Sequence, residues 1–380
     1  MSPQIVKPPR KAMSKQAYVF QPMLTCIGNK RKLIPHIKGV LDDVAKAVGK
    51  SKLRLGDAFA GSGVVSREFT YSASALYSND LEPYSYLMAH CYLVVPGEAQ
   101  QARIANHIAA MNTLAEKGPW NEGIVCKLYA PKVTTDIQEG ERCFYTRENA
   151  LILDTLRAYI EESVEPSLQP YCLAPLLVKA SIHTNTAGVF KGFYKKNGKG
   201  CFGGAGENAL ERILKPIRLD MPRWNAAGPA TVVCSQKEVL AFVADLPTDL
   251  DLLYLDPPYN QHPYGSNYFM LNVIASNKEP VALSKISGIP TDWNKSAFNR
   301  HAPALAAMRD LLTEGLKKSK YLLLSYNNEG ILTPADWTEL FAGYTVQTYT
   351  IPYPCYKGSR NLADREGNVM EILYLISKPE

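Results

Sequence analysis

The sequence predicts an α/β fold, in which a doubly wound, mostly parallel sheet carries a mostly helical inserted segment. Two short apolar runs near the start of the chain are each followed by a segment whose apolar residues have helical spacing. The same alternation returns after about residue 228 and continues almost to the end of the chain. Between about 97 and 228 the alternation is absent and helical patterns dominate. Strands that alternate with helices are typical of open parallel sheets.

The first elements follow a β-α-β-α order. Apolar residues recur at helical spacing between 28 and 48, which predicts a helix there. A short apolar strand begins at Leu53, and a glycine-containing turn leads from it into a second helix. The next strand, over 75–80, ends in Asp80, and the segment 82–95 is predicted to be helical. This opening is typical of a Rossmann-like sheet.

The later elements complete this sheet around the insertion. The insertion contains three helical patterns and then a run rich in glycine and lysine, at 101–116, 147–162, 171–182 and 188–206. Strand and helix patterns resume at 230–243, 251–260, 304–317 and 321–326. Two alternating runs, at 344–351 and 369–377, predict an antiparallel hairpin at the sheet edge. We therefore expect a basic flexible arm (1–23), a sheet domain (24–96 and 229–380) and an inserted domain (97–228).

Composition narrows the class of protein. The net charge of +6 suits a polyanionic partner, although many other enzymes are equally basic. The eight cysteines form no CxxC pair and have no accompanying histidine set, so we expect neither a metal site nor a disulfide scaffold. No secretory signal is recognisable, and no apolar run approaches the ~18 residues that a membrane span needs. These features predict a cytoplasmic protein that makes no membrane contact.

A glycine-containing turn and an acidic residue suggest a nucleoside site. In LGDAFAGSG, at 55–63, Gly61 and Gly63 allow close approach of the backbone to a ligand, and the following helix offers free N–H groups. The same segment is equally compatible with a simple tight turn. Asp80 lies where an acid in this fold accepts hydrogen bonds from ribose hydroxyls, but it also suits the start of the next helix.

The segment LLYLDPPYN, at 252–260, is far more specific. An apolar strand delivers Asp256, Pro257 and Tyr259 to the carboxyl edge of the sheet, where open α/β folds bind ligands. An exocyclic amine is a poor nucleophile because its lone pair is delocalised into the ring. The Asp256 carboxylate and the Pro257 carbonyl can accept its two hydrogens, and Tyr259 can stack on the base for ~1–3 kcal/mol. The alternative is a proline-terminated strand that leads into an ordinary loop.

In this order, DAFAGSG, Asp80 and DPPY resemble the α-group of DNA adenine methyltransferases, the group that contains Dam. The detail around 256–275 and 185–219 is similar to methyltransferases of type IIS and other type II restriction-modification systems. The resemblance implies a class I methyltransferase sheet, S-adenosylmethionine as cofactor, catalysis by Asp256, Pro257 and Tyr259, and a target-recognition role for the insertion. The cofactor contacts that it implies are Cys26, Lys30, Asp57, Phe59, Gly61, Gly63, Asp80, Gln236 and Asp256. The family has an aromatic residue at position 26 and an Asp at position 236, so this chain departs from it at Cys26 and Gln236.

Double-stranded DNA is the partner that the resemblance implies, with the target adenine extruded from the helix. Lys191, Lys195, Lys196 and Lys199 alternate with aromatic residues and are expected to contact phosphates, unless the run is only a solvated hairpin. Asn267 and Tyr268 are expected to line the pocket for the extruded base, although a helix start packed under the loop suits them too. His183, Asn185 and Thr186 either reach base edges or cap local structure. A companion restriction endonuclease and a bacterial or phage origin would fit this family.

Three other functions remain compatible with the sequence. An RNA adenine methyltransferase is less favoured because many such enzymes have Asn in place of Asp256, and a cytosine amine methyltransferase usually has Ser there. A non-catalytic DNA-recognition subunit on the same fold is also considered because of Cys26 and Gln236. The intact DPPY sequence favours an active adenine-N6 methyltransferase.

Overall fold

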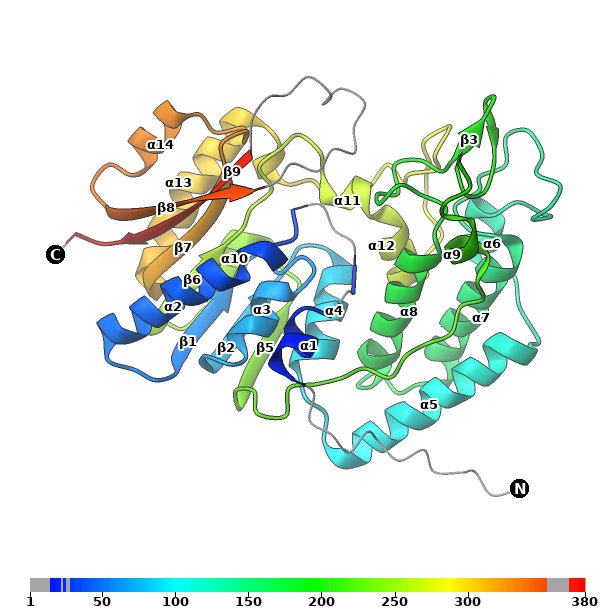
Figure 1. The fold of residues 1–380 in the computed structure, drawn as a ribbon, viewed down its shortest axis with the longest axis horizontal. Helices are drawn as coiled ribbons and strands as arrows, with labels where there is room; N and C mark the ends of the chain where they lie inside the picture. The colour runs from blue at the N-terminus through cyan, green and yellow to red at the C-terminus, as the bar shows by residue number, and fades with distance from the viewer. Residues whose placement is uncertain (1–13, 22, 25–27, 205, 354–368, 380) are drawn as a thin grey trace.

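The chain folds around a single large sheet that has helices on both faces. The structure, a computed structural model, describes all residues except 1–13, 22, 25–27, 205, 354–368 and 380. The sheet has seven strands in the order β5-β2-β1-β6-β7-β9-β8 and occupies one half of the molecule in Figure 1. Its strands are β1 (Leu53–Asp57), β2 (Ala73–Asn79), β5 (Thr231–Ser235), β6 (Leu250–Leu255), β7 (Ser319–Asn327), β8 (Thr345–Tyr353) and β9 (Val369–Ser377).

Strand directions confirm the doubly wound, Rossmann-like methyltransferase fold that the sequence predicts. Strands β5, β2, β1, β6 and β7 are parallel, and the chain reverses its winding between β1 and β6. The terminal hairpin is antiparallel as expected, but β9 inserts between β7 and β8, so β8 alone forms the edge. Pro352 lies in that edge strand, where a missing backbone donor breaks no further ladder. Ligands in such folds bind beyond the carboxyl ends of the strands at the reversal point.

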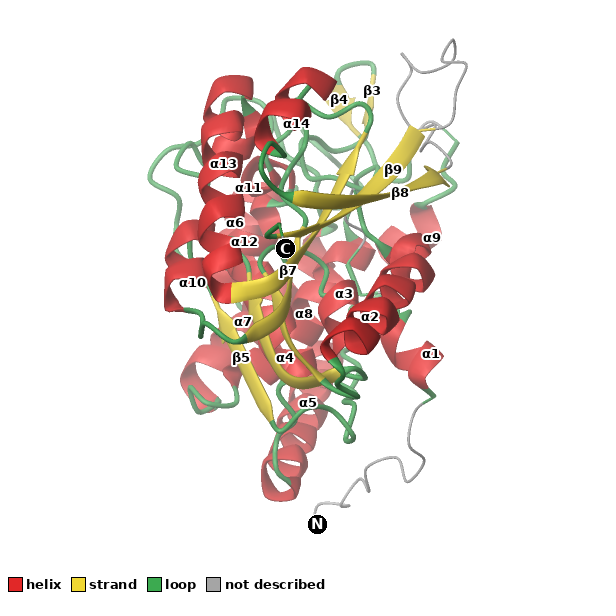
Figure 2. Cartoon of the chain, turned by 90° about the vertical axis from the view of Figure 1, so that its left-hand side faces the viewer, coloured by secondary structure: helices red, strands yellow, loops and turns green. Residues whose placement is uncertain are grey.

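Two helical layers bury the apolar faces of the sheet. On one face, α2 (Ile34–Val48), preceded by the 3-10 turn η1 (Arg31–Leu33), and α3 (Val64–Phe69) share a core with β1, β2 and β6. On the other face lie η2 (Ala297–Asn299), α10 (Val239–Asp245), α13 (His301–Lys318) and α14 (Pro334–Leu340). Figure 2 shows the sheet between these two layers. Each layer uses apolar side chains at helical spacing, which is the pattern that made these helices predictable.

The insertion forms a helical half beside the sheet, and it shares its core with two sheet-domain helices (Figure 1). Its helices are α5 (Glu98–Lys117), α6 (Ile124–Tyr129), α7 (Arg147–Ser163), α8 (Gln169–His183) and α9 (Leu210–Leu214). The helix α4 (Pro83–Leu93) turns Met88 and Cys91 toward this half and Ala89 and Leu93 toward the sheet. The helix α12 (Phe269–Ser276), which follows the DPPY segment, is also part of the helical core. The expected division at 96 and 229 therefore does not separate two independent cores.

The expected flexible arm is wrong for its last third. Residues Lys15–Val19 form α1, whose Tyr18 and Val19 are almost fully buried. The Tyr18 hydroxyl donates to the carbonyl of Tyr92, and the buried Arg67 guanidinium donates to the carbonyl of Tyr18. The buried side chains of Tyr18 and Val19 thus hold this segment against α3 and α4. The preceding residues, 1–13, lie outside the described part of the chain.

The Gly- and Lys-rich run forms a small hairpin at the end of the helical half. Strands β3 (Lys195–Lys196) and β4 (Lys199–Gly200) pair antiparallel around an Asn197-Gly198 turn. Both turn residues have positive φ, 53° and 81°, which is the geometry that Asn-Gly favours in two-residue hairpins. Within the described residues, no helix is both long and apolar enough to cross a membrane.

Candidate active site

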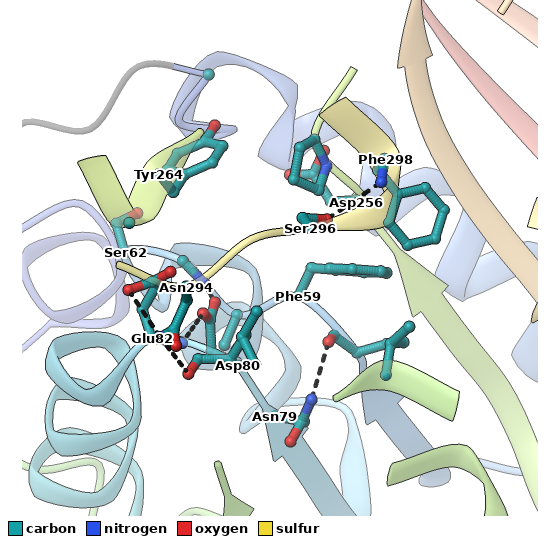
Figure 3. A pocket seen from close by; sticks show the side chains of 18 of the residues that line it. Phe59, Ser62, Asn79, Asp80, Glu82, Asp256, Tyr264, Asn294, Ser296 and Phe298 are labelled. Atoms are coloured by element: carbon teal, nitrogen blue, oxygen red, sulfur yellow. Dashed lines mark hydrogen bonds between the residues drawn. The ribbon is translucent and has the colours of Figure 1, made fainter. Parts of the chain in front are cut away.

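A cavity of about 310 Å³ opens at the reversal point of the sheet. Its walls come from the ends of β1, β2 and β6 and from the segment 294–299, which crosses in front of α13. Figure 3 shows Asp80, Glu82 and Asn294 at one end and Asp256, Ser296 and Phe298 at the other. The parallel strands bring these side chains together because their carboxyl ends share one edge. This is the location that the motif order predicts.

A buried lysine lies against the DPPY carboxylate. The ammonium of Lys30 is 3.1 Å from Oδ1 of Asp256 and 3.6 Å from Oε2 of Glu371, and its side chain is only 3% exposed. It also lies 5.1 Å from the centre of the Tyr259 ring. Despite these distances, the ammonium has no well-aligned hydrogen-bond partner within the described residues. Its donors are therefore available to another group that enters the cavity.

Burial dominates the titration of this cluster. It raises the pKa of Asp256 to about 6, although the nearby Lys30 ammonium opposes the shift. It also raises the pKa of Glu371. For Lys30 burial alone would lower the pKa, but the Asp256 carboxylate and its neighbours outweigh this and raise it. The lysine therefore stays charged, while Asp256 changes charge within the range of ordinary assay conditions.

The DPPY segment continues from β6 as a rigid edge of the cavity. Within this segment, Pro257 is buried and Pro258 lines the cavity. The carbonyl of Tyr259 accepts a hydrogen bond from the N–H of Ile331. A side chain at Gly28 would approach the hydroxyls of Tyr259 and Tyr264 to 3.1 Å, and Gly28 has a φ of 75°. Glycine is therefore required for this close approach.

The carboxylate of Asp80 accepts hydrogen bonds from the backbone and also lines the cavity. Its Oδ2 accepts from the N–H of Gly61 at 2.7 Å, and its Oδ1 accepts from the N–H of Glu82 at 2.9 Å. The second bond closes a turn just before α4, whose N-cap is Glu82, so Asp80 is not itself the N-cap of that helix. Each carboxylate oxygen can accept more than one hydrogen bond, so ligand binding remains possible beside these contacts. Burial raises the pKa of Asp80.

Five of the nine expected cofactor residues line the cavity: Lys30, Phe59, Gly61, Asp80 and Asp256. The Phe59 ring packs edge-on against Phe298 at 5.6 Å, and both rings face the cavity. Asp57 and Gly63 are adjacent but do not line it. The Asp57 carboxylate accepts from the Ser66 hydroxyl at 2.5 Å, and burial raises its pKa to about 7. Gly63 begins α3 with a φ of 72°, and both residues shape the turn.

The remaining two expected contacts have different outcomes. Gln236 is exposed and does not line the cavity; it directly follows β5, which ends at Ser235. The next three residues, 237–239, line the cavity instead. Cys26 lies outside the described residues, so its contact stays a prediction.

A further carboxylate in the cavity wall, that of Glu82, was not predicted from the sequence. Glu82 is 4% exposed, and its Oε2 accepts from the amides of Asn272, in α12, and Asn294. Burial raises the pKa of Glu82 to about 7. These bonds connect the turn after β2 to the helix that follows the DPPY segment. Single Asn and Glu residues separated by about 190 positions have no recognisable spacing, which is why the sequence did not indicate them.

The four lysines of the expected DNA contact lie together on an exposed surface. Lys195, Lys196 and Lys199 are in the hairpin, and Lys191 precedes it. The Lys191 ammonium is 3.5 Å from Nδ1 of His262, which follows the DPPY segment. The ammonium of Lys195 lies over the Phe193 ring at 5.0 Å. Lys191, just before the hairpin, therefore lies next to the segment that follows DPPY.

Asn267 and Tyr268 are buried, which matches a helix start packed under the loop, and their contact with an extruded base stays a prediction. They are 4% and 2% exposed, and Tyr268 packs between Tyr264 and Tyr84. They connect α12 and the short α11 (Tyr264–Asn267) to the helical half, since the carbonyl of Asn267 accepts from the N–H of Phe190. Tyr268 and the apolar residues that follow it, between Phe269 and Ala275, pack in the same core.

The residues before the hairpin support its base. Asn185 is fully buried, and its amide donates to the carbonyls of Cys143 and Cys201 while its oxygen accepts from the N–H of Gly203. The ring of His183 is hydrogen-bonded to the carbonyl of Arg212. These contacts match the local-cap alternative and leave no polar atom of Asn185 free to read a base edge.

Comparison with known proteins agrees with this arrangement. The chain matches the family model "D12 class N6 adenine-specific DNA methyltransferase" over residues 27–328. It is 28% identical over 321 residues to the type II methyltransferase M.CviAII of Paramecium bursaria Chlorella virus 1, covering 84% of this chain and 87% of that protein. It is 27% identical over 364 residues to the type II methyltransferase M.NlaIII of Neisseria lactamica, covering 93% and 98%. It is also 29% identical to the modification methylase StsI of Streptococcus sanguinis, covering 93% of this chain and 51% of that one.

The family match spans β1, β2, β5, β6 and β7, and it includes Lys30, Asp80 and the DPPY segment. Together with the Rossmann-like sheet, it makes the chain an enzyme that methylates adenine in DNA at specific sites. The chain belongs to the D12 class of N6 adenine-specific DNA methyltransferases.

Proposed function

We propose that the cavity holds S-adenosylmethionine and that Asp256, Pro257 and Tyr259 hold an adenine extruded from double-stranded DNA. The observation that carries the proposal is the position of the Asp256 carboxylate, in the wall of a cavity that Asp80 also lines. An acceptor for an amine and an acceptor for ribose hydroxyls thus share one opening.

The chemistry of the lining residues fits this cofactor. The buried Asp80 carboxylate retains acceptor capacity for ribose hydroxyls. Phe59 and Phe298 offer apolar surface to a purine, and the Lys30 ammonium has donors without well-aligned partners in the described chain. Lys237, Glu238 and Val239 take the place in the cavity wall that the sequence assigned to Gln236. When bound, S-adenosylmethionine supplies a methyl group made electrophilic by its sulfonium.

The DPPY segment prepares the acceptor amine. The Asp256 carboxylate and the Pro257 carbonyl accept the two amine hydrogens, which favours a tetrahedral nitrogen with a localised lone pair. Tyr259 stacks on the base, and its ring also stands near the Lys30 ammonium. Fixed acceptors of this kind act mainly by position and electrostatics. Loss of an amine proton after transfer is favoured by the adjacent carboxylate.

Duplex DNA lies across the opening in this proposal, in contact with the hairpin. Lys191, Lys195, Lys196 and Lys199 neutralise phosphates, and the helical half supports the hairpin from below. The short separation between Lys191 and His262 keeps this contact next to the catalytic loop. Because M.CviAII and M.NlaIII are type II methyltransferases, a restriction endonuclease of the same site specificity is the proposed companion in the cell.

A product analysis tests this proposal. Purified protein is incubated with S-adenosylmethionine carrying a labelled methyl group and with duplex DNA, duplex RNA or single-stranded DNA. The expected label is in N6-methyladenine of duplex DNA, and modification-sensitive sequencing then gives the target site. Label that enters RNA in preference to DNA, or cytosine in preference to adenine, would contradict the proposal.

A further inference from the structure

The carboxylate of Glu371 is a buried charge that the mechanism above leaves without a role. It lies in β9, in register with Asn327 of β7 and Ile351 of β8, so two neighbouring strands enclose it. Its side chain is 6% exposed, and Oε2 has no hydrogen-bond partner among the described residues. Burying an ionised carboxylate with so little support is unfavourable, so its retention calls for a specific partner.

Lys30 is that partner, and Asp256 shares it. The ammonium is 3.1 Å from Asp256 and 3.6 Å from Glu371, so one cation stands between two carboxylates. The side chains come from three distant parts of the chain: the turn before η1, the end of β6 and the last strand. This cluster, formed by Lys30, Asp256 and Glu371, carries one excess negative charge when all three groups are ionised.

The catalytic role proposed for Asp256 creates a problem that Glu371 solves. Oδ1 of Asp256, the oxygen beside the Lys30 ammonium, is the acceptor that this inference assigns to the adenine amine, so the amine exchanges with the ammonium at that oxygen. Without a second carboxylate, that exchange would leave a buried ammonium with no counter-ion, which is strongly unfavourable. With Glu371 in place, a small movement of the Lys30 side chain restores an ion pair.

We propose that Glu371 is a positioning residue, which takes over the Lys30 ammonium and so frees the Asp256 carboxylate to hold the target amine. This inference rests on the proposed role of Asp256 and extends it to a residue more than a hundred positions away. Glu371 itself touches neither the base nor the cofactor. Its effect on catalysis passes entirely through Lys30.

Glu371 also contributes to the charge state of Asp256. Its negative charge raises the pKa of Asp256, after burial and against the opposing effect of Lys30. The other titratable groups that act on the cluster are Asp57 and Asp80, at the ends of β1 and β2, and the phenols of Tyr254 and Tyr259. All of these groups are acids. The pKa of Asp256 therefore depends on whether the Lys30 ammonium pairs with Asp256 or with Glu371.

The test is the pH dependence of single-turnover methyl transfer to duplex DNA by Glu371→Gln and by the parent protein. The Gln variant keeps the shape but removes the charge, so Lys30 pairs with Asp256 alone. We expect the acidic limb of the profile to move to lower pH by about one unit. We also expect the rate constant on the plateau to fall about tenfold or more, with the cofactor dissociation constant changed less than about threefold.

Three further variants make the result decisive. Glu371→Asp keeps the charge and should retain the parent pH profile, which also covers the case that the Gln variant folds poorly. Asp251→Asn removes another buried carboxylate of the sheet, one paired with Lys50 at the opposite end of β6, and should leave the profile unchanged. In Lys30→Met combined with Glu371→Gln, the loss should be smaller than the two single losses together, because the trapped ion pair no longer exists.

Two outcomes separate this inference from the proposed function. If Asp256→Ala is inactive but Glu371→Gln keeps both the parent rate and the parent pH profile, the inference about Glu371 is wrong and the proposed function stands. If Asp256→Ala retains the parent rate, the proposed function itself fails. Strictly additive effects of the Lys30 and Glu371 substitutions would also overturn the inference.

Discussion

The cavity and the lysine hairpin differ in how their charged side chains are placed. Those of the cavity have close partners inside the protein, whereas those of the hairpin face solvent. In the cavity, the Lys30 ammonium lies within ion-pair distance of both Asp256 and Glu371, and Asp80 is held by two backbone N–H groups. On the hairpin, Lys195, Lys196 and Lys199 are exposed, and none of them makes an ion pair with another described residue. Catalysis needs acceptors fixed to within fractions of an ångström, whereas phosphate contacts need cations that adapt to a long polyanion. The difference predicts which substitutions act on rate and which act on affinity.

The largest expected effect lies at the centre of the cavity. Asp256→Ala should reduce the single-turnover rate constant by at least about 100-fold, because it removes a preorganised charged acceptor from a water-poor site. Asp251→Asn, in the strand β6 that Asp256 follows, serves as the matched control and should keep the parent rate. The melting temperature of both variants should be measured by circular dichroism. An Asp256→Ala protein with a rate within twofold of the parent would remove Asp256 from the catalytic site.

The next effect is on cofactor affinity. Asp80→Asn keeps one oxygen for the backbone contacts but loses the charge, so S-adenosylmethionine should bind about tenfold more weakly or worse in calorimetry. Binding of duplex DNA without cofactor should not change. Gln236→Ala is the control, since Gln236 is exposed and away from the cavity, and it should change cofactor affinity less than about twofold. Equal losses in the two variants would restore Gln236 as a cofactor contact.

The hairpin should respond through affinity and salt dependence. Replacing Lys191, Lys195, Lys196 and Lys199 by Ala should weaken binding to specific and unrelated duplexes about equally. Each lost phosphate contact should reduce the slope of log K against log salt by about 0.9. Under saturating DNA, the single-turnover rate constant should stay near the parent value. A salt slope equal to that of the parent would show that the hairpin is only a solvated surface loop.

The smallest effect is a pH dependence of the parent protein. Burial raises the pKa of Asp256 to about 6, and the proposed reaction uses the ionised form. Therefore kcat/KM for DNA should be constant at higher pH and fall as the pH drops through about 6. A raised pKa also means that the folded state holds the proton more tightly than the unfolded chain. The contribution of Asp256 to stability should consequently decline as pH rises from about 4 to about 6. A profile that is flat down to pH 5 would contradict the assignment.

Patterns in contiguous residues were enough to predict most of the fold and the residues at the centre of the site. The strand β6 is an apolar run that DPPY follows directly, and β8 and β9 alternate in polarity, so these features were visible in contiguous residues. The sheet then brought Asp80 and Asp256 to one edge without any further information. The helical character of the insertion was predicted for α5, α7 and α8, whereas α6 and α9 were too short to show a period.

The remainder depends on contacts between distant residues. Glu371 and Asn294 are single polar residues in otherwise ordinary segments, and only the packed chain brings them to Lys30 and Glu82. Tyr268 belongs to a polar and aromatic stretch that suited a base pocket, but its ring fills the core of the helical half. Gln236 aligned with a family position, yet it is exposed directly after β5. The direction of a side chain in a loop is set by tertiary packing. It therefore cannot be predicted from the spacing of apolar residues in the sequence.

The shared helix α4 limits how this enzyme can be recombined with its relatives. The helix begins immediately after the turn that carries Asp80 and Glu82, and it presents Met88 and Cys91 to the helical half and Ala89 and Leu93 to the sheet. A chimera that exchanged only residues 97–228 would set a foreign helical core against the native faces of α4 and α12. Cavities and clashes at such a seam cost several kcal/mol in total, which is a large part of a domain's stability. An exchange of the insertion between members of this class must therefore also exchange the residues of α4 and α12 that pack against the helical half.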